Sequence, residues 1–314
     1  MKKEDLTIVY MGTPDFAVPS LEALLTKHEV VLVVTQPDKP KGRGKKMVPT
    51  PVKACALEHG IPVLQPEKVK EPEFVEQLRS YEPDLIAVTA FGQILSEPIL
   101  EMPKYGCINV HGSLLPKYRG AAPMQWSIID GEKVTGITTM YMAKGLDSGD
   151  MLLKAEVEIT DEDTFATIHD KMAVTGANLL LDTLDQLEAG TLERIPQDHD
   201  AATYAPMITK ETGHIDWSKN RQDIINLIRG LNPVPAAYTI YEEEVLKIFG
   251  AVISDVQADD AANGEIVAVV KKGFVVKCGD GCLLITEVQA RGGKRMMTDA
   301  YLRGHAMKEG ILLQ

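Results

Sequence analysis

Apolar and polar positions along residues 1–190 follow two alternating patterns. Short apolar or alternating runs, typical of strands, occupy 6–11, 30–35, 61–64, 84–89, 105–110, 136–142 and 151–159. Between them, apolar residues recur with the helical period at 18–27, 52–60, 71–80 and 160–188. A strand followed by an amphipathic helix is the repeating unit of a doubly wound sheet. This part of the chain is therefore predicted to be an α/β domain with a Rossmann-like sheet.

The pattern changes after residue 190. Residues 191–206 are polar and irregular, which predicts a linker. Beyond a short helix at 220–231, turn signals separate short strands that are predicted at 236–241, 245–252, 264–270, 273–278 and 282–289. Regularly spaced short strands are typical of a small β-barrel. We therefore expect an α/β domain at 1–190, a linker at 191–206 and a smaller OB-like β-barrel domain at 207–314.

Composition narrows the class of protein. The chain has 314 residues and a net charge of −12, which argues against a general nucleic-acid binder. It has neither a long apolar span nor the apolar core of a signal peptide, and its four cysteines are scattered, so a cytoplasmic protein with reduced thiols is expected. Cys278 and Cys282 flank Gly-Asp-Gly, which favours a hairpin turn over a metal site. No metal is expected.

Residues 38–53 form a basic segment in an acidic chain. They hold six lysines and arginines against one aspartate, among several prolines and glycines. Such a segment is often only a solvated loop. On an acidic body it can also steer a polyanion to one place. The residues alone leave both interpretations open.

The stretch 106–116, GCINVHGSLLP, contains the strongest candidate chemistry. Ile108 and Val110 alternate with Asn109 and His111, so the amide and the imidazole point the same way at a strand end. Such a pair can donate hydrogen bonds to a developing oxyanion. The alternative is that both are ordinary polar residues whose hydrogen bonds are satisfied at the end of a strand.

Asp147 is the third candidate and follows a separate predicted strand. It lies in a loop rich in aspartate and glycine, where an aspartate often only forms a turn. A carboxylate beside His111 would orient the imidazole and stabilise its protonated form. Ser113 lies close to His111 in sequence but lacks the pattern of a nucleophile elbow.

Two segments together resemble a known family. The stretch from Asn109 to Pro123, NVHGSLLPKYRGAAP, and the loop 145–150, GLDSGD, are similar to the signature of folate-dependent formyltransferases. The stretches GTPDF at 12–16 and GRGKK at 42–46 narrow the resemblance to the members that act on tRNA. The resemblance covers the whole chain, including a C-terminal barrel similar to an OB fold.

The resemblance implies an activity and its partners. A formyl group would pass from 10-formyltetrahydrofolate, a co-substrate, to the methionine amino group of initiator methionyl-tRNA for translation initiation. The tRNA would be the macromolecular partner. A monomer is expected, without a protein partner and without a membrane.

The resemblance also implies roles for individual residues. The implied catalytic residues are Asn109, His111 and Asp147. The implied folate-binding residues are Ser113, Leu114, Leu115 and Pro116, with Phe91, Gly92, Gln93, Ile94 and Leu95 near the pterin. The implied residues at the methionine and the tRNA are Phe16, Arg43, Lys45 and Lys46. Beside Gly292 and Gly293, three basic residues either contact the tRNA or form a solvated turn, namely Arg291, Lys294 and Arg295.

Other functions are compatible with parts of the pattern. A formyltetrahydrofolate hydrolase domain and a glycinamide ribonucleotide transformylase would share the catalytic trio. The basic GRGKK loop disfavours the hydrolase, and the C-terminal barrel disfavours the transformylase. A nucleotide-binding module without chemistry is disfavoured because the turn at Gly12-Thr13-Pro14 lacks the G-x-G-x-x-G fingerprint.

Overall fold

The computed structural model describes residues 6–41 and 46–314. The described residues form two compact units that interrupt each other in the sequence. Unit 1 lies within Met1–Gly120, Thr135–Glu158 and His169–Tyr204, and unit 2 lies within Ala121–Val134, Ile159–Ile168 and Ala205–Gln314. This division differs from the predicted boundaries 1–190, 191–206 and 207–314, because two early segments belong to unit 2.

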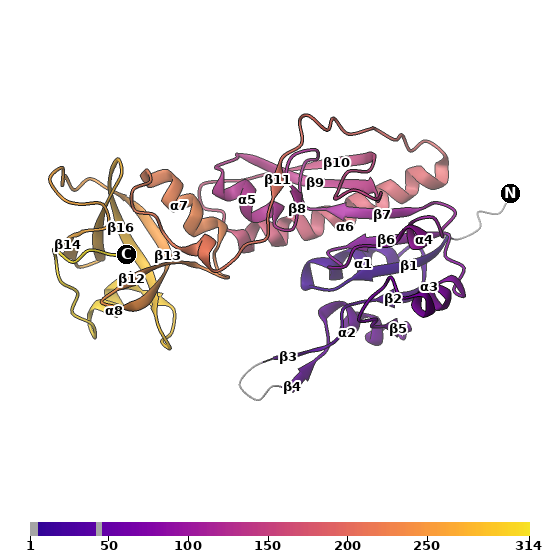
Figure 1. The fold of residues 1–314 in the computed structure, drawn as a ribbon, viewed down its shortest axis with the longest axis horizontal. Coiled ribbons are helices and arrows are strands. Elements are labelled where there is room, and N and C mark those ends of the chain that lie inside the picture. Colours follow the sequence, from indigo (N-terminus) through magenta and orange to yellow (C-terminus); the bar gives the residue numbers. More distant parts are fainter. Residues whose placement is uncertain (1–5, 42–45) are drawn as a thin grey trace. The chain divides into compact units, whose positions relative to one another are not determined.

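Unit 1 is built on a seven-stranded sheet in the order β10-β9-β7-β6-β1-β2-β5 (Figure 1). The strands from β7 to β5 in this order are parallel, whereas β9 runs antiparallel to β7. The strands of this sheet are β1 Thr7–Gly12, β2 Glu29–Val34, β5 Val63–Leu64, β6 Leu85–Thr89, β7 Cys107–His111, β9 Val134–Tyr141 and β10 Met151–Glu158. A mostly parallel sheet agrees with the doubly wound fold that the sequence predicts.

Helices accompany this sheet. They are η1 Asp15–Ala17, α1 Val18–Leu25, α2 Pro51–Glu58, α3 Pro72–Arg79, α4 Glu97–Leu100 and α6 Phe165–Ala189, the first turn of α6 belonging to unit 2. Every residue of β6 is buried, as expected for a parallel strand covered on both faces. Within the described residues, no helix combines the length and the apolar character that a bilayer crossing requires.

The basic segment contains two short paired strands, which the sequence analysis did not predict. β3 Lys39–Lys41 pairs antiparallel with β4 Lys46–Val48 and projects from unit 1 (Figure 1). At its base, Lys53 Nζ donates to Asp38 Oδ2 over 2.7 Å and to Gln65 Oε1 over 2.6 Å. The hydrogen bond from Lys53 lowers the pKa of the Asp38 carboxyl. The pairing escaped the sequence analysis because the short strands consist of lysine, proline and a few apolar residues without clear alternation.

Unit 2 contains a six-stranded antiparallel sheet in the order β12-β13-β16-β15-β14, with β17 added to β16. Its strands are β12 Ala237–Tyr241, β13 Glu244–Ser254, β14 Ile266–Val270, β15 Gly273–Cys278, β16 Gly281–Ala290 and β17 Met296–Met297. A core that includes Trp217 and Phe274 lies against this sheet. The predicted strands are therefore present, and the Gly-Asp-Gly stretch is the hairpin turn between β15 and β16.

The remaining elements are short. They are β8 Arg119–Gly120, α5 Pro123–Ile129, β11 Tyr204–Ala205, η2 Glu211–Gly213, α7 Arg221–Gly230 and α8 Thr298–Leu302. In unit 2, α5 packs against α7 at Gly230, where an added Cβ would come within 2.6 Å of Ile129 Cγ1 and 3.0 Å of the Gln125 carbonyl. This close approach explains why residues 121–134 join unit 2.

Replacing Gly230 with alanine tests this helix contact. Alanine is favoured over glycine within helices by roughly 0.5–1 kcal/mol, but overpacking of this kind typically costs about 1–3 kcal/mol. We therefore expect a net loss of stability for Gly230→Ala in urea unfolding. The control is Gly304→Ala, where the nearest atom to the new Cβ lies 4.0 Å away. Equal unfolding midpoints for the two variants would contradict the packing argument.

Candidate active site

The strand β7 places two of the candidate residues on one face of the sheet. Side chains alternate along a strand, so Asn109 and His111 point the same way near its end. β7 pairs with β6 on one side and with β9 on the other, through Val88↔Asn109 and His111↔Thr138. His111 is buried and Asn109 is half-buried. The backbone that carries both side chains is therefore held from two sides.

Asp147 reaches His111 from a loop. Asp147 Oδ2 lies 3.7 Å from His111 Nδ1 and accepts a 2.8 Å hydrogen bond from the Gly120 backbone N–H. Because β9 is antiparallel to β7, Tyr141 at its end pairs with Ile108, near the beginning of β7. The loop 142–150 must therefore run back toward His111. The structure brings Asp147 and His111 together by a path that strand order alone does not indicate.

The other imidazole nitrogen has a fixed partner. His111 Nε2 lies 3.0 Å from the carbonyl oxygen of Tyr118. A carbonyl oxygen only accepts hydrogen bonds, so Nε2 carries the proton of this bond. Nδ1 is consequently the nitrogen that faces Asp147. At 3.7 Å the two groups form no direct hydrogen bond, since N–H···O bonds have donor–acceptor distances of about 2.7–3.2 Å, and the carboxylate attracts the ring only when the imidazole is protonated.

The Asn109 carboxamide keeps its donors available. It makes no hydrogen bond to another of the described residues, and Asn109 is only half-buried. An amide N–H can therefore be offered to a ligand at the same face as His111 Nδ1. With Asp147 beside the imidazole, the site combines a neutral donor, a group that can hold a proton and a carboxylate. This combination suits acyl transfer.

The segment after β7 is tied down mainly through its backbone. Thr138 Oγ1 donates to the Ser113 carbonyl over 2.7 Å and accepts from the Leu115 N–H over 3.1 Å. Lys154 Nζ donates to the Leu115 carbonyl, and burial lowers the pKa of this ammonium group. Ser113 and Leu115 are fully buried, whereas Leu114 and Pro116 are half-buried. Of the four predicted folate contacts, only Leu114 and Pro116 thus have side chains within reach of a ligand.

Ser113 and the nearby cysteine are unsuited to nucleophilic catalysis. The Ser113 hydroxyl donates to the Lys117 carbonyl over 2.6 Å. Cys107 begins β7, and burial raises the pKa of its thiol to about 12. A thiol with this pKa stays protonated near neutrality and is a poor nucleophile. These observations argue against Ser113 and Cys107 as nucleophiles.

The predicted pterin loop follows β6, the neighbour of β7. Phe91 and Leu95 are buried in the core of unit 1, while Gly92 and Ile94 are exposed, Ile94 to 86%. Gln93 accepts from the Val69 N–H over 3.0 Å and donates to the Pro66 carbonyl over 3.2 Å. Among these five predicted contacts, Gly92 and Ile94 therefore offer surface, and the other three hold the loop in place.

The loops after β1, β2 and β6 meet at one carbonyl. The Phe91 carbonyl accepts from Thr13 Oγ1 over 2.9 Å and from Gln36 Nε2 over 3.2 Å. Phe16, the predicted methionine contact, lies in η1 after β1 and is 5% exposed, and its ring centroid is 5.4 Å from that of His169. These bonds join the three loops at the carboxyl edge of the parallel strands, where ligands of such sheets bind.

The structure describes only some of the predicted tRNA contacts. Arg43 and Lys45 lie outside the described residues, and Lys46 is described only as the first residue of β4. Arg291 and Lys294 are exposed, and Arg291 pairs with Glu244 at 3.3 Å.

Arg295 is already engaged within unit 2. Its Nε and Nη2 donate to the two carboxylate oxygens of Glu287 over 2.7 Å each, and its Nη1 donates to Asn232 Oδ1 over 3.0 Å. The guanidinium also covers the Phe249 ring. These contacts indicate a structural role for Arg295, in contrast to Arg291 and Lys294.

Two residues near the site were missed by the sequence analysis. Gln197 donates to the carbonyls of Asp147 and Gly149, and Arg119 donates to Gln197. Gln197 belongs to the polar stretch that was predicted to be a linker. A single buried glutamine gives no periodic signal, so its burial could not be read from the pattern. Arg119 lies inside the NVHGSLLPKYRGAAP stretch, but nothing in its neighbours indicates a buried guanidinium.

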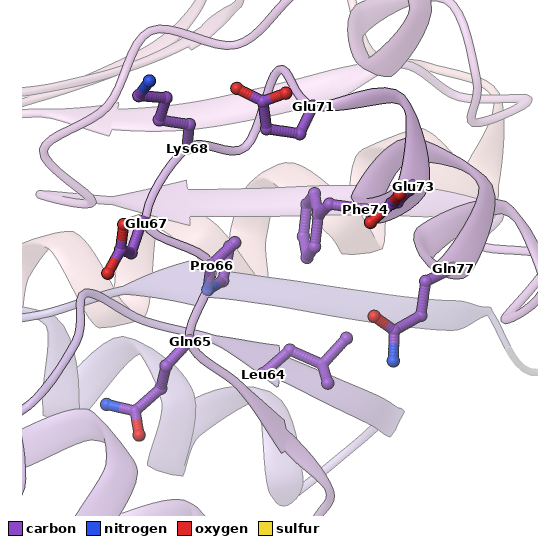
Figure 2. Close-up of a pocket in the computed structure, with 9 residues that line it drawn as sticks. All are labelled: Leu64, Gln65, Pro66, Glu67, Lys68, Glu71, Glu73, Phe74 and Gln77. Atoms are coloured by element: carbon purple, nitrogen blue, oxygen red, sulfur yellow. The ribbon is translucent and has the colours of Figure 1, made fainter.

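A separate surface pocket lies between the end of β5 and α3. It has a volume of about 510 Å³, and Figure 2 shows Leu64, Pro66 and Phe74 at the middle of its lining with polar side chains around them. Its charged lining residues are Glu67, Lys68, Glu71 and Glu73. None of the predicted site residues lines this pocket. An acidic lining of this kind suits neither a folate carboxylate nor a phosphate.

Comparison with known proteins adds a family to this geometry. Residues 6–184 match the formyl transferase family and residues 207–306 match the formyl transferase C-terminal domain. The chain is 53% identical over 309 residues to a methionyl-tRNA formyltransferase of Acetivibrio thermocellus, covering 98% of this chain and 99% of that protein. It is 55% identical over 307 residues to the methionyl-tRNA formyltransferase of Ruminiclostridium cellulolyticum, covering 97% and 98%.

A solved structure shares the fold. It is HypX from Aquifex aeolicus in complex with tetrahydrofolic acid, with a TM-score of 0.63 and 16% identity. The match covers 99% of this chain and 51% of HypX, so the chain spans about half the length of that protein. This likeness concerns the fold alone. Identity above one half over nearly the whole length of the two curated relatives, together with both family matches, is decisive: the chain belongs to the formyl transferase family.

Proposed function

We propose that the protein transfers the formyl group of 10-formyltetrahydrofolate to the amino group of methionine on initiator methionyl-tRNA. The observation that carries this proposal is the pairing of His111 with Asp147 beside the unbonded amide of Asn109. The chain is similar over nearly its full length to relatives that are named for this reaction. Formyl transfer between two amines needs an oxyanion donor and a proton path, and these three residues can supply both.

The reaction forms one bond and breaks one bond at the formyl carbon. The methionine nitrogen attacks this carbon and the carbonyl oxygen becomes an oxyanion. The new C–N bond remains when the bond to N10 of the folate breaks. One proton leaves the attacking nitrogen and one proton joins N10, so the charge balances over the whole step. The enzyme has to stabilise the oxyanion and move that proton.

Asn109 and His111 are assigned to the oxyanion. The Asn109 amide N–H is free to donate, and a protonated His111 can donate from Nδ1 while Nε2 stays bound to the Tyr118 carbonyl. Asp147 stabilises the protonated imidazole and can accept the proton of the attacking amine. Its Oδ2 is held by the Gly120 N–H, so the carboxylate stays near the imidazole. The half-buried Leu114 and Pro116 and the exposed Ile94 would border the folate.

The tRNA is assigned to the basic residues. Arg43, Lys45 and Lys46 belong to the basic segment 38–53, and the bonds of Lys53 to Asp38 and Gln65 hold the base of the β3–β4 hairpin in that segment. Most of the chain is acidic, so a localised basic element would direct the polyanion to one place. Arg291 and Lys294 on unit 2 are assigned to phosphate contacts. Arg295 is assigned to the structure of unit 2 because its donors are used by Glu287 and Asn232.

Replacing His111 with alanine tests the chemistry. We expect kcat for formyl transfer to fall by about 10²–10³, the usual effect of losing one oxyanion donor. Binding of 10-formyltetrahydrofolate, followed by calorimetry, should stay close to that of the wild type. His59→Ala, at the C-cap position after α2, is the matched control and should keep its rate. A His111→Ala variant that turns over like the wild type would remove His111 from the mechanism.

Replacing Arg43 with alanine tests the basic hairpin. We expect a lower kcat/KM for methionyl-tRNA, and a dependence on salt concentration that is shallower by about one phosphate contact. Binding of the formyl donor should not change. The control is Lys27→Ala, which removes an exposed lysine paired with Asp185 in the same unit. If both variants show the wild-type salt dependence, the hairpin is only a solvated element.

A further inference from the structure

The position of Asp147 is not explained by its own loop. Residues 142–150 contain no helix or strand, and 143–146 are exposed. Asp147 itself has φ +44°, in the left-handed region that residues other than glycine adopt uncommonly, although aspartate tolerates it better than most. Such a conformation costs roughly 1–3 kcal/mol and persists only where the surroundings impose it. Something outside the loop must therefore hold this backbone.

Gln197 provides that hold. It is 6% exposed, and its Nε2 donates to the Asp147 carbonyl over 2.8 Å and to the Gly149 carbonyl over 2.7 Å. A carboxamide nitrogen has two N–H donors, and here both are used on one loop. The two carbonyls lie on either side of Ser148. The side chain thus bridges the turn that presents the Asp147 carboxylate.

Arg119 fixes the direction of the Gln197 amide. Its Nε and Nη2 donate to Gln197 Oε1 over 3.0 and 2.7 Å, and Nη2 also lies 3.1 Å from His199 Nδ1. An arginine only donates, so the glutamine oxygen must face Arg119 and the nitrogen must face the loop. Arg119 is 3% exposed. In this buried setting a reversed amide would leave several polar atoms unpaired, which is costly.

Arg119 also belongs to the segment that fixes the other two groups. The Tyr118 carbonyl accepts from His111 Nε2, and the Gly120 N–H donates to Asp147 Oδ2. Three consecutive residues thus hold the imidazole, the carboxylate and, through Gln197, the backbone beneath the carboxylate. We infer that Gln197, oriented by Arg119, is a positioning residue: it keeps the Asp147 carboxylate beside the His111 imidazole during formyl transfer. This inference rests on the proposed function of the site.

The main experiment is a double-mutant cycle on formyl transfer to methionyl-tRNA. Gln197→Glu keeps the shape of the side chain but replaces its NH₂ group with a carboxylate oxygen. This oxygen cannot donate to the carbonyls of Asp147 and Gly149 and is repelled by them. Acting through Asp147, the substitution should lower kcat by on the order of 10²-fold, the typical effect of a displacement of about 1 Å at a reacting group. KM for 10-formyltetrahydrofolate should change little. In the Asp147→Asn background the same substitution should have almost no further effect.

Controls separate positioning from stability. Gln197→Met, which has a similar size and no donor, is measured in parallel in case Gln197→Glu does not fold. Gln257→Glu alters an exposed glutamine that donates to the backbone carbonyl of Asp255 in unit 2, and it should match the wild type. The melting temperature of every variant is recorded beside its rate.

Each outcome decides a different claim. A wild-type enzyme that does not formylate methionyl-tRNA would overturn the proposed function. An active wild type whose Gln197 and Asp147 losses simply multiply would overturn the positioning role alone. A Gln197 variant with a lowered melting temperature and a normal kcat would do the same. Loss of kcat that vanishes in the Asp147→Asn background supports the inference.

Discussion

The site depends on the approach of Asp147 to His111, whose Oδ2 and Nδ1 atoms lie 3.7 Å apart. The two residues come from different kinds of element, a strand and a loop. His111 lies on β7, whose backbone is paired on both sides within the sheet. Asp147 lies on a loop without regular structure, in the left-handed backbone region that residues other than glycine adopt uncommonly. A carboxylate placed this way can act on the imidazole only while other groups hold the loop. The Gly120 N–H and the Gln197 amide are those groups.

The surrounding segments show the same division between holding and binding. Ser113 and Leu115 are buried and bonded to Thr138 and Lys154, while Phe91 and Leu95 belong to the core. These buried and bonded residues set the position of the neighbouring side chains that are exposed. Among the proposed folate contacts, Leu114 and Pro116 are half-buried, and Gly92 and Ile94 are exposed. Substitutions at the buried positions would act on the site by moving its backbone.

Charge is used differently in the two units. In unit 1, Lys53 lies at the base of the β3–β4 hairpin, and its charge is paired with the Asp38 carboxylate. In unit 2, the guanidinium of Arg295 donates hydrogen bonds to Glu287 and Asn232. Exposed ion pairs contribute little to stability, whereas a bidentate arginine that also covers Phe249 orders a turn. Counting basic residues in a sequence therefore overestimates those that are free to meet a polyanion.

Periodicity and motif spacing in the sequence predicted the strands of the large sheet and those of the C-terminal domain. They also predicted that Asn109 and His111 point to the same face of one strand. These features could be predicted because each depends on residues that are close together in the chain. The hairpin β3–β4 was missed because its short strands lack alternation. Only the tertiary structure decided that β9 runs against β7 and that loop 142–150 returns Asp147 to His111. It alone revealed Gln197 as a buried support, since a polar residue far along the chain carries no local sign of what it contacts. Such contacts depend on the distance between atoms after folding, and sequence separation says little about that distance.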